Sequence, residues 1–97
     1  MDAYGDFLGR LQTAFRSSDR RGVIALVALP LRVRSGGKTE VYRSARDIER
    51  DFDEIFTPQV KQSVLSQRAD SDGRAGNSRI RFTSSRDGEF RIREVRP

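Results

Sequence analysis

Apolar residues in the first part of the chain recur at helical spacing. They fall three or four positions apart from Tyr4 to Phe15, which predicts an amphipathic helix over about 2–17. Ser18-Asp19 then supplies a helix cap, so a short second helix should follow. Its apolar residues are Val23, Ile24, Leu26 and Val27. This helix must end before Pro30, because proline disfavours helical backbone in the residue that precedes it.

Helix signals return in the middle of the chain. Ser44 and Asp47 approximate a capping box, in which a hydroxyl and a carboxylate three residues later cap the first turn. The apolar residues that follow share one stripe of a 3.6-residue repeat, and they are Ile48, Phe52, Ile55 and Phe56. Thr57-Pro58 offers a new cap with proline in the first turn, which predicts that the chain turns and begins another short helix. Val60, Val64 and Leu65 are the apolar residues of that helix.

A first hairpin is predicted around Gly36-Gly37, between strands at 31–34 and 39–43. A two-residue loop would place Val33 opposite Glu40, whereas a three-residue loop would pair Val33 with Val41 and Arg34 with Glu40. We favour the three-residue loop, because a slip by one residue turns the apolar side chains towards solvent.

A second hairpin is predicted at the end of the chain, after a polar segment over 67–78 that reads as a loop, or a loop with a short edge strand. Its apolar residues are Ile80, Phe82, Phe90 and Ile92. The alternation requires a three-residue turn, Arg86-Asp87-Gly88, with Gly88 in the left-handed conformation. In this register Arg81 lies directly across from Arg93.

These elements predict a single α+β domain over residues 1–97. Their order is helix, helix, hairpin, helix, short helix and then a β-meander, and the helices should pack on one face of a curved antiparallel sheet. The early helix pair, the exit Ala28-Leu29-Pro30-Leu31 into a strand, and the acidic and aromatic segment Asp51–Val60 resemble the nuclear transport factor 2-like (cystatin-like α+β roll) superfamily. The likeness extends over nearly the whole chain, and its strongest part resembles an uncharacterised bacterial branch.

The resemblance implies a cone-shaped roll in which the sheet curves around a helix. Members of the superfamily often dimerise through the sheet, and they serve as small-molecule isomerases, dehydratases or hydrolases, or as non-catalytic binding modules. The polar segment over 67–78 departs from the pattern, since relatives usually carry a longer apolar strand there. A shallower cone is therefore expected.

Composition limits the remaining possibilities. The chain has 97 residues and 26 large apolar side chains, which suffice for one modest core and leave few to line an empty pocket. It contains 17 Arg against 2 Lys and has a net charge of +5. It has no cysteine and no histidine, which removes thiolate and His-based metal sites and the commonest general base. We expect a cytoplasmic protein, because no apolar run approaches the roughly 20 residues of a membrane span.

The pocket candidates are the aromatic residues and one carboxylate that a cone could bring together. They are Tyr4, Phe15, Tyr42, Phe52, Asp53, Phe56, Phe82 and Phe90. In enzymes of the superfamily an Asp works with Tyr, Arg or His near the cone mouth, so the resemblance implies Asp53, Tyr4 and Tyr42 as the analogues. No motif sets their geometry, and we assign no catalytic residue, metal or cofactor.

The partner-surface candidates lie on the outward side of the last hairpin. They are Arg79, Arg81, Arg91 and Arg93. Guanidinium groups match the geometry of carboxylates and phosphates, so such a face suits an acidic partner. Nucleic acid is the weaker alternative, since no aromatic residues interleave with the arginines to stack bases.

The leading hypothesis is therefore a small non-catalytic module that acts through protein contacts, as a homodimer through its sheet or with an acidic protein. The alternative is a cone that binds a small apolar ligand or works as an isomerase or dehydratase.

Overall fold

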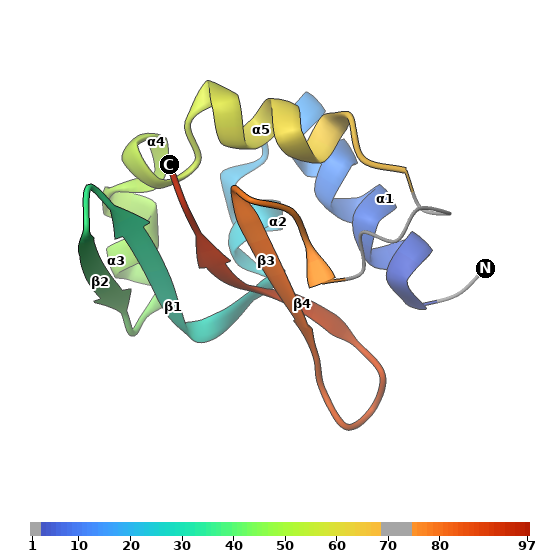
Figure 1. Ribbon diagram of the computed structural model, residues 1–97. Coiled ribbons are helices and arrows are strands. Elements are labelled where there is room, and N and C mark those ends of the chain that lie inside the picture. Colours follow the sequence, from blue (N-terminus) through green and yellow to red (C-terminus); the bar gives the residue numbers. More distant parts are fainter. Residues whose placement is uncertain (1–2, 69–74) are drawn as a thin grey trace.

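The computed structural model describes residues 3–68 and 75–97, which form five helices and four strands (Figure 1). The helices are α1 (Ala3–Arg16), α2 (Arg20–Ile24), α3 (Ala45–Arg50), α4 (Phe52–Ile55) and α5 (Pro58–Leu65). The strands are β1 (Val27–Ser35), β2 (Lys38–Tyr42), β3 (Ile80–Ser84) and β4 (Phe90–Val95). The predicted loop over 67–78 falls partly on residues 69–74, which lie outside the described residues; Gly76 in its described part forms a bridge with Arg81.

The four strands form one open, mixed sheet in the order β2-β1-β4-β3. Both hairpins are antiparallel, but the two central strands, β1 and β4, run parallel, with Val27 beside Ile92 and Val33 beside Val95. The expected purely antiparallel sheet is therefore wrong. The periodicity within each hairpin predicts the pairing of its own strands, but it holds no signal for how two hairpins separated by three helices meet.

The helices lie on one side of this sheet (Figure 1). The buried residues of the strands form one hydrophobic cluster with those of the helices. In β1, Leu31 and Val33 are buried while Arg32 and Arg34 are exposed, as the two-residue period of a strand requires. Helix α1 packs on β4, α5 on β3 and α3 on β2. The core therefore fills the space between the helices and the inner face of the sheet, and the outer face carries the arginines.

The first hairpin has a two-residue turn, so the expected three-residue loop is wrong. Ser35 pairs with Lys38 and Val33 with Glu40, and the two turn glycines have φ values of 57° and 81°. Two consecutive positive φ angles are the geometry of a tight hairpin turn that glycine adopts without strain. The alternation of apolar and polar residues in β2 does not predict which of its side chains are buried, because this edge strand buries only Tyr42 and leaves Val41 44% exposed.

The second hairpin has the predicted three-residue turn, with Gly88 at φ 84° and Ser85 bonded to Glu89 across it. Its register changes further along, because the ladder is irregular between Arg81 and Phe82. The extra residue on β4 is Arg93, so Arg81 lies across from Glu94 instead of Arg93. A bulge of this kind relieves the repulsion that two directly opposed arginines would create.

The central helix is interrupted at Asp51, where φ is −107° and ψ is 21°, so the single helix expected after Ser44 is two short ones. The predicted caps are confirmed: the Ser44 hydroxyl accepts from the Asp47 amide and the Thr57 hydroxyl from the Val60 amide. The predicted apolar stripe is confirmed as well, since all four of its side chains are buried. The break leaves the stripe intact and turns the Asp51 carboxylate towards β2, where Tyr42 donates to it.

Candidate functional site

The aromatic pocket candidates form two clusters within the core. The Tyr4 ring packs in a tilted arrangement against Phe82 and edge-on against Phe90, at centroid distances of 6.4 and 5.5 Å. Phe56 lies 5.8 Å from Phe15 and 4.9 Å from Phe52. All of these side chains are buried except Phe90, which is partly exposed at the edge of the core. The rings pack against each other in the core, and Phe15 and Phe52 also line, with Asp53, a small cavity of about 100 Å³.

Tyr4 and Tyr42 lie in separate parts of the structure. The side chain of Tyr4 is fully buried, and its hydroxyl accepts a hydrogen bond of 2.7 Å from the Gln67 amide nitrogen. Tyr42 lies on the edge strand β2, whereas the aromatic partners of Tyr4 lie on β4, beyond β1, and on β3 at the opposite edge of the sheet. The two hydroxyls are therefore not arranged as partners in one site.

Tyr42 makes the most unusual polar contact among the pocket candidates. Its hydroxyl lies 2.9 Å from an Asp51 carboxylate oxygen and 3.2 Å from one of Glu40. It has a single proton to donate, so the two carboxylates compete for it. Burial and the two neighbouring carboxylates raise the pKa of Tyr42 above its ordinary value of 10. A cavity of about 240 Å³ opens beside it, lined also by Lys38 and Glu54.

Asp53 lies away from both tyrosines, at the edge of the cavity of about 100 Å³ that Phe15 and Phe52 also line. It forms an ion pair of 3.0 Å with Arg20, and its side chain is 76% exposed. The Arg20 guanidinium carbon also lies 5.3 Å from the centre of the Phe52 ring. The sequence places Asp53 next to the apolar stripe, but the break at Asp51 rotates α4 and turns this carboxylate towards α2. The expectation of a carboxylate near the two tyrosines is therefore wrong for Asp53, and Asp51 occupies that position for Tyr42.

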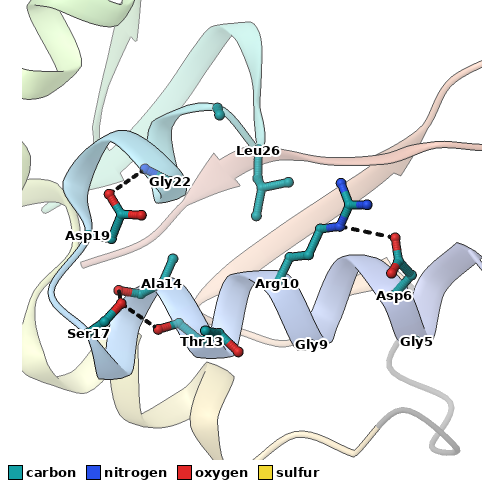
Figure 2. Close-up of a pocket in the computed structure, with 11 residues that line it drawn as sticks. Gly5, Asp6, Gly9, Arg10, Thr13, Ala14, Ser17, Asp19, Gly22 and Leu26 are labelled. Atoms are coloured by element: carbon teal, nitrogen blue, oxygen red, sulfur yellow. Dashed lines mark hydrogen bonds and ion pairs between the residues drawn. The ribbon is translucent and has the colours of Figure 1, made fainter.

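A groove of about 570 Å³ runs between α1 and the α2–β1 connection, and sequence reasoning missed it (Figure 2). Gly5 and Gly9 line its α1 side and Leu26 its other side, while Asp6 and Arg10 form an ion pair of 3.2 Å at one end (Figure 2). None of the pocket candidates lines it. Its sequence signal is the pair of glycines four positions apart on one face of α1, where the missing side chains leave space.

The outer face of the sheet gathers arginines from three strands and the residues next to them. They are Arg32, Arg34, Arg79, Arg81, Arg91, Arg93 and Arg96. The parallel pairing of β1 and β4 aligns Val41, Arg32, Glu94 and Arg81 in one row across the sheet. Beyond Val33 and Val95, the last pair of β1 with β4, the chain continues to Arg34 and Arg96, and the Arg96 amide donates to the Arg79 carbonyl at 2.7 Å. We call these seven residues the arginine face.

Few acidic groups balance the arginine face. Arg96 pairs with Glu94 at 2.9 Å, and Arg91 pairs with Glu89 at 2.6 Å. Arg79 donates to the Pro97 carbonyl oxygen at 3.1 Å. Within residues 3–68 and 75–97, no carboxylate forms an ion pair with the remaining four, which are Arg32, Arg34, Arg81 and Arg93.

The tight first hairpin accounts for part of this imbalance. Glu40 was expected opposite Arg34, but the two-residue turn places it opposite Val33, on the side of the sheet that faces the helices. Its carboxylate accepts from Tyr42 there. Arg34 is left with Thr39 as its cross-strand neighbour, so the local charge of the outer face is more positive than the sequence pairing predicted.

The described part of the chain contains no group of three or more acidic or thiol side chains arranged to hold a metal ion. Its helices also include none with the length and apolar character that crossing a membrane requires. No protein-family model matches the chain, and no curated protein or solved structure is significantly similar to it.

Proposed function

We propose that the chain is a small non-catalytic module, of the nuclear transport factor 2-like kind, that acts by binding another protein through the arginine face. The observation that carries this proposal is that the side chains suited to catalysis lie apart from one another, whereas the arginines lie together on one face of the sheet. Tyr4, Tyr42 and Asp53 do not form one site, since each makes a hydrogen bond or an ion pair with a different residue of the fold. Seven arginines, in contrast, share one open face.

Charge argues for a partner different from this chain. A symmetric homodimer that stacked two outer faces would bring the arginine rows of both copies together. Like charges in direct opposition are destabilising, and Glu94, the acidic residue within the rows, is already paired with Arg96. The sheet homodimer expected from the superfamily is thus the less favourable use of this face, and sedimentation velocity at low and high salt should show a monomer.

Binding through the arginine face is tested with matched charge reversals. The face variant carries Arg34→Glu and Arg93→Glu, and the control carries Arg21→Glu and Arg46→Glu on helices α2 and α3; all four side chains are exposed. The two variants have the same net charge. The same bound protein should be recovered with the wild type and the control, and lost with the face variant, when each is used as bait in a lysate of its native cells. Equal recovery with both variants would reject the arginine face as the contact surface, as would a dimer that only the face variant dissociates.

The cavity beside Tyr42 supports a second candidate, the binding of a small cationic or hydrogen-bonding ligand. Tyr42 and Glu40 both line this cavity, and the hydroxyl already has more acceptors than protons. A ligand that binds only the folded state raises the melting temperature. A compound that stabilises the wild type but not Tyr42→Phe would favour this candidate, and a broad screen without such a compound would count against it.

A further inference from the structure

The proposed partner can be given a chemical class from the make-up of the arginine face. Three kinds of partner suit an arginine-rich surface: an acidic polypeptide, a nucleic acid and an anionic lipid surface. They differ in what they require beside the positive charge. Bases need aromatic rings or flat platforms on which to stack, lipid surfaces need apolar or aromatic anchors that insert, and an acidic polypeptide needs spaced cations around apolar contacts.

Aromatic rings are missing from this face. The eight aromatic residues of the chain are all described, and all belong to or pack against the core on the inner side of the sheet. Phe82 and Phe90, the aromatic residues of the two C-terminal strands, contact Tyr4 and Phe7 of α1. Single-stranded nucleic acid could therefore pair its phosphates with the arginines, but its bases would have no aromatic ring on which to stack.

Two large apolar side chains are exposed among the described residues, Leu29 of β1 at 50% and Val41 of β2 at 44%. Val41 lies on the outer face, at the β2 end of the row that continues through Arg32, Glu94 and Arg81. Two aliphatic side chains without an aromatic ring are a small anchor for a bilayer, whereas Val41 fits a polypeptide that carries an apolar side chain among its carboxylates. The row thus combines an apolar position on β2 with arginines on β1 and β3, which flank Glu94 on β4.

Glu94 organises the cations around it. It is only 6% exposed although it lies on the open face, because it has Arg32 on one neighbouring strand and Arg81 on the other, and its carboxylate pairs with Arg96. Within the described part of the chain, the buried Nε of Arg81 has no hydrogen-bond acceptor. Glu94 is paired with Arg96, so a carboxylate of a partner would pair with the guanidinium groups of Arg32 and Arg81 that this single acidic residue leaves without an ion pair among the described residues.

We infer that the arginine face binds an acidic polypeptide segment, whose carboxylates pair with Arg32, Arg34, Arg81 and Arg93. This inference rests on the proposed function, because it names the partner of the same surface. The guanidinium groups supply paired N–H donors, and each carboxylate accepts them in the bidentate arrangement. Affinity should fall as salt concentration rises, since the pairs are exposed to solvent.

The test uses poly-L-glutamate as the acidic probe, with oligothymidine, duplex DNA of equal charge and phosphatidylserine vesicles as alternatives. Binding of fluorescent probes is measured for the wild type, the face variant (Arg34→Glu with Arg93→Glu) and the control (Arg21→Glu with Arg46→Glu). We expect poly-L-glutamate to bind the wild type and the control equally and the face variant at least about tenfold more weakly. Circular dichroism and melting temperatures show whether each variant folds, and Arg34→Gln with Arg93→Gln provides a milder change with an intermediate loss.

Three results would overturn the inference. If the face variant and the control lose equal affinity for poly-L-glutamate, the probe is attracted by the net charge of the protein alone. Tighter, face-dependent binding of an oligonucleotide or of vesicles would assign the surface to that class instead. If poly-L-glutamate does not bind but a cellular protein is recovered by the wild type and not by the face variant, the partner is not acidic and the proposed function stands. If the wild type and the face variant recover that protein equally, both the inference and the proposed function are rejected.

Discussion

The two faces of the sheet follow opposite rules, although the same strands build both. On the inner face, Leu31, Ile80, Ile92 and Val95 are fully buried beneath the helices. On the outer face, the alternate residues of these strands are mostly arginines, and four of those seven have no ion-pair partner among the described residues. Apolar burial on the inner face stabilises the fold, while the outer face has positive charge that no carboxylate of the described residues balances.

That difference separates residues that fold the protein from residues that are available for binding. Apolar burial stabilises in proportion to the area removed from water, so changes on the inner face should act on the free energy of unfolding. Exposed ion pairs contribute little to stability, so changes at the exposed positions of the outer face should act on association instead, with the buried Glu94 as the exception. The following four predictions test this separation, in order of decreasing effect.

Phe56→Ala should be the most damaging change. Phe56 is 1% exposed and packs on Phe15 and Phe52, so its removal leaves a cavity and should lower the free energy of unfolding by about 3 to 5 kcal/mol. Val41→Ala on the outer face is the control and should cost less than about 1 kcal/mol. Urea denaturation of both variants measures the difference. Similar losses would show that Val41 is part of the core and that the two faces are not distinct.

Glu94→Gln tests the one acidic residue within the arginine rows. The change removes a carboxylate that is 6% exposed, and should lower the free energy of unfolding by about 1 to 2 kcal/mol. The loss is moderated because its partner Arg96 is 43% exposed to solvent. Glu89→Gln removes an exposed pair with Arg91 and should change stability by less than about 0.5 kcal/mol. If the two variants are equally stable, Glu94 does not organise the surrounding arginines.

Tyr42→Phe should have a modest effect at neutral pH and a distinct one in alkali. Loss of the hydroxyl should cost about 0.5 to 1.5 kcal/mol at neutral pH. The pKa of Tyr42 is raised in the folded state above its ordinary value of 10, so the unfolded chain loses this proton first as pH rises. The stability associated with Tyr42 is therefore complete below pH 10 and declines above it.

The alkaline part of that prediction is checked by chemical denaturation at a series of pH values. The decline above pH 10 should be shallower in Tyr42→Phe than in the wild type, because the variant lacks the titrating group. Parallel curves for the two proteins would show that the carboxylates of Glu40 and Asp51 do not hold the hydroxyl in its protonated form.

Asp53→Asn should have the smallest effect. The ion pair of Asp53 with Arg20 is exposed, so its loss should change the free energy of unfolding by less than about 0.5 kcal/mol. Any compound found by ligand screening should stabilise this variant and the wild type alike, because Asp53 lies outside the cavity beside Tyr42. A ligand that requires Asp53 would instead place a site at the small cavity of about 100 Å³ between α1, α2 and α4.

The predictable part of the candidate site was the local part. Strand alternation placed Arg79, Arg81, Arg91 and Arg93 on the outward side of the last hairpin, because side chains two residues apart share a face. It did not predict that Arg32 and Arg34 join them, since that depends on the parallel contact between β1 and β4. The analogy places Asp53 and the two tyrosines at one mouth, but Tyr4 lies on α1, Tyr42 on the edge strand β2, and Asp53 on α4 pairs with Arg20.

Local patterns in the sequence account for the first helix, the caps, the apolar stripes and the turn at Gly88, because each depends on residues within a few positions of one another. They do not account for the early end of the second helix, since Val27 begins β1, or for the break at Asp51. Four features arise only when distant segments meet: the order of the strands, the bulge at Arg93, the face of the sheet on which Glu40 lies, and the arginines that neighbour Glu94. The physical reason is range: capping and periodicity act along the chain, whereas strand order and like-charge repulsion depend on segments that meet only after the chain folds.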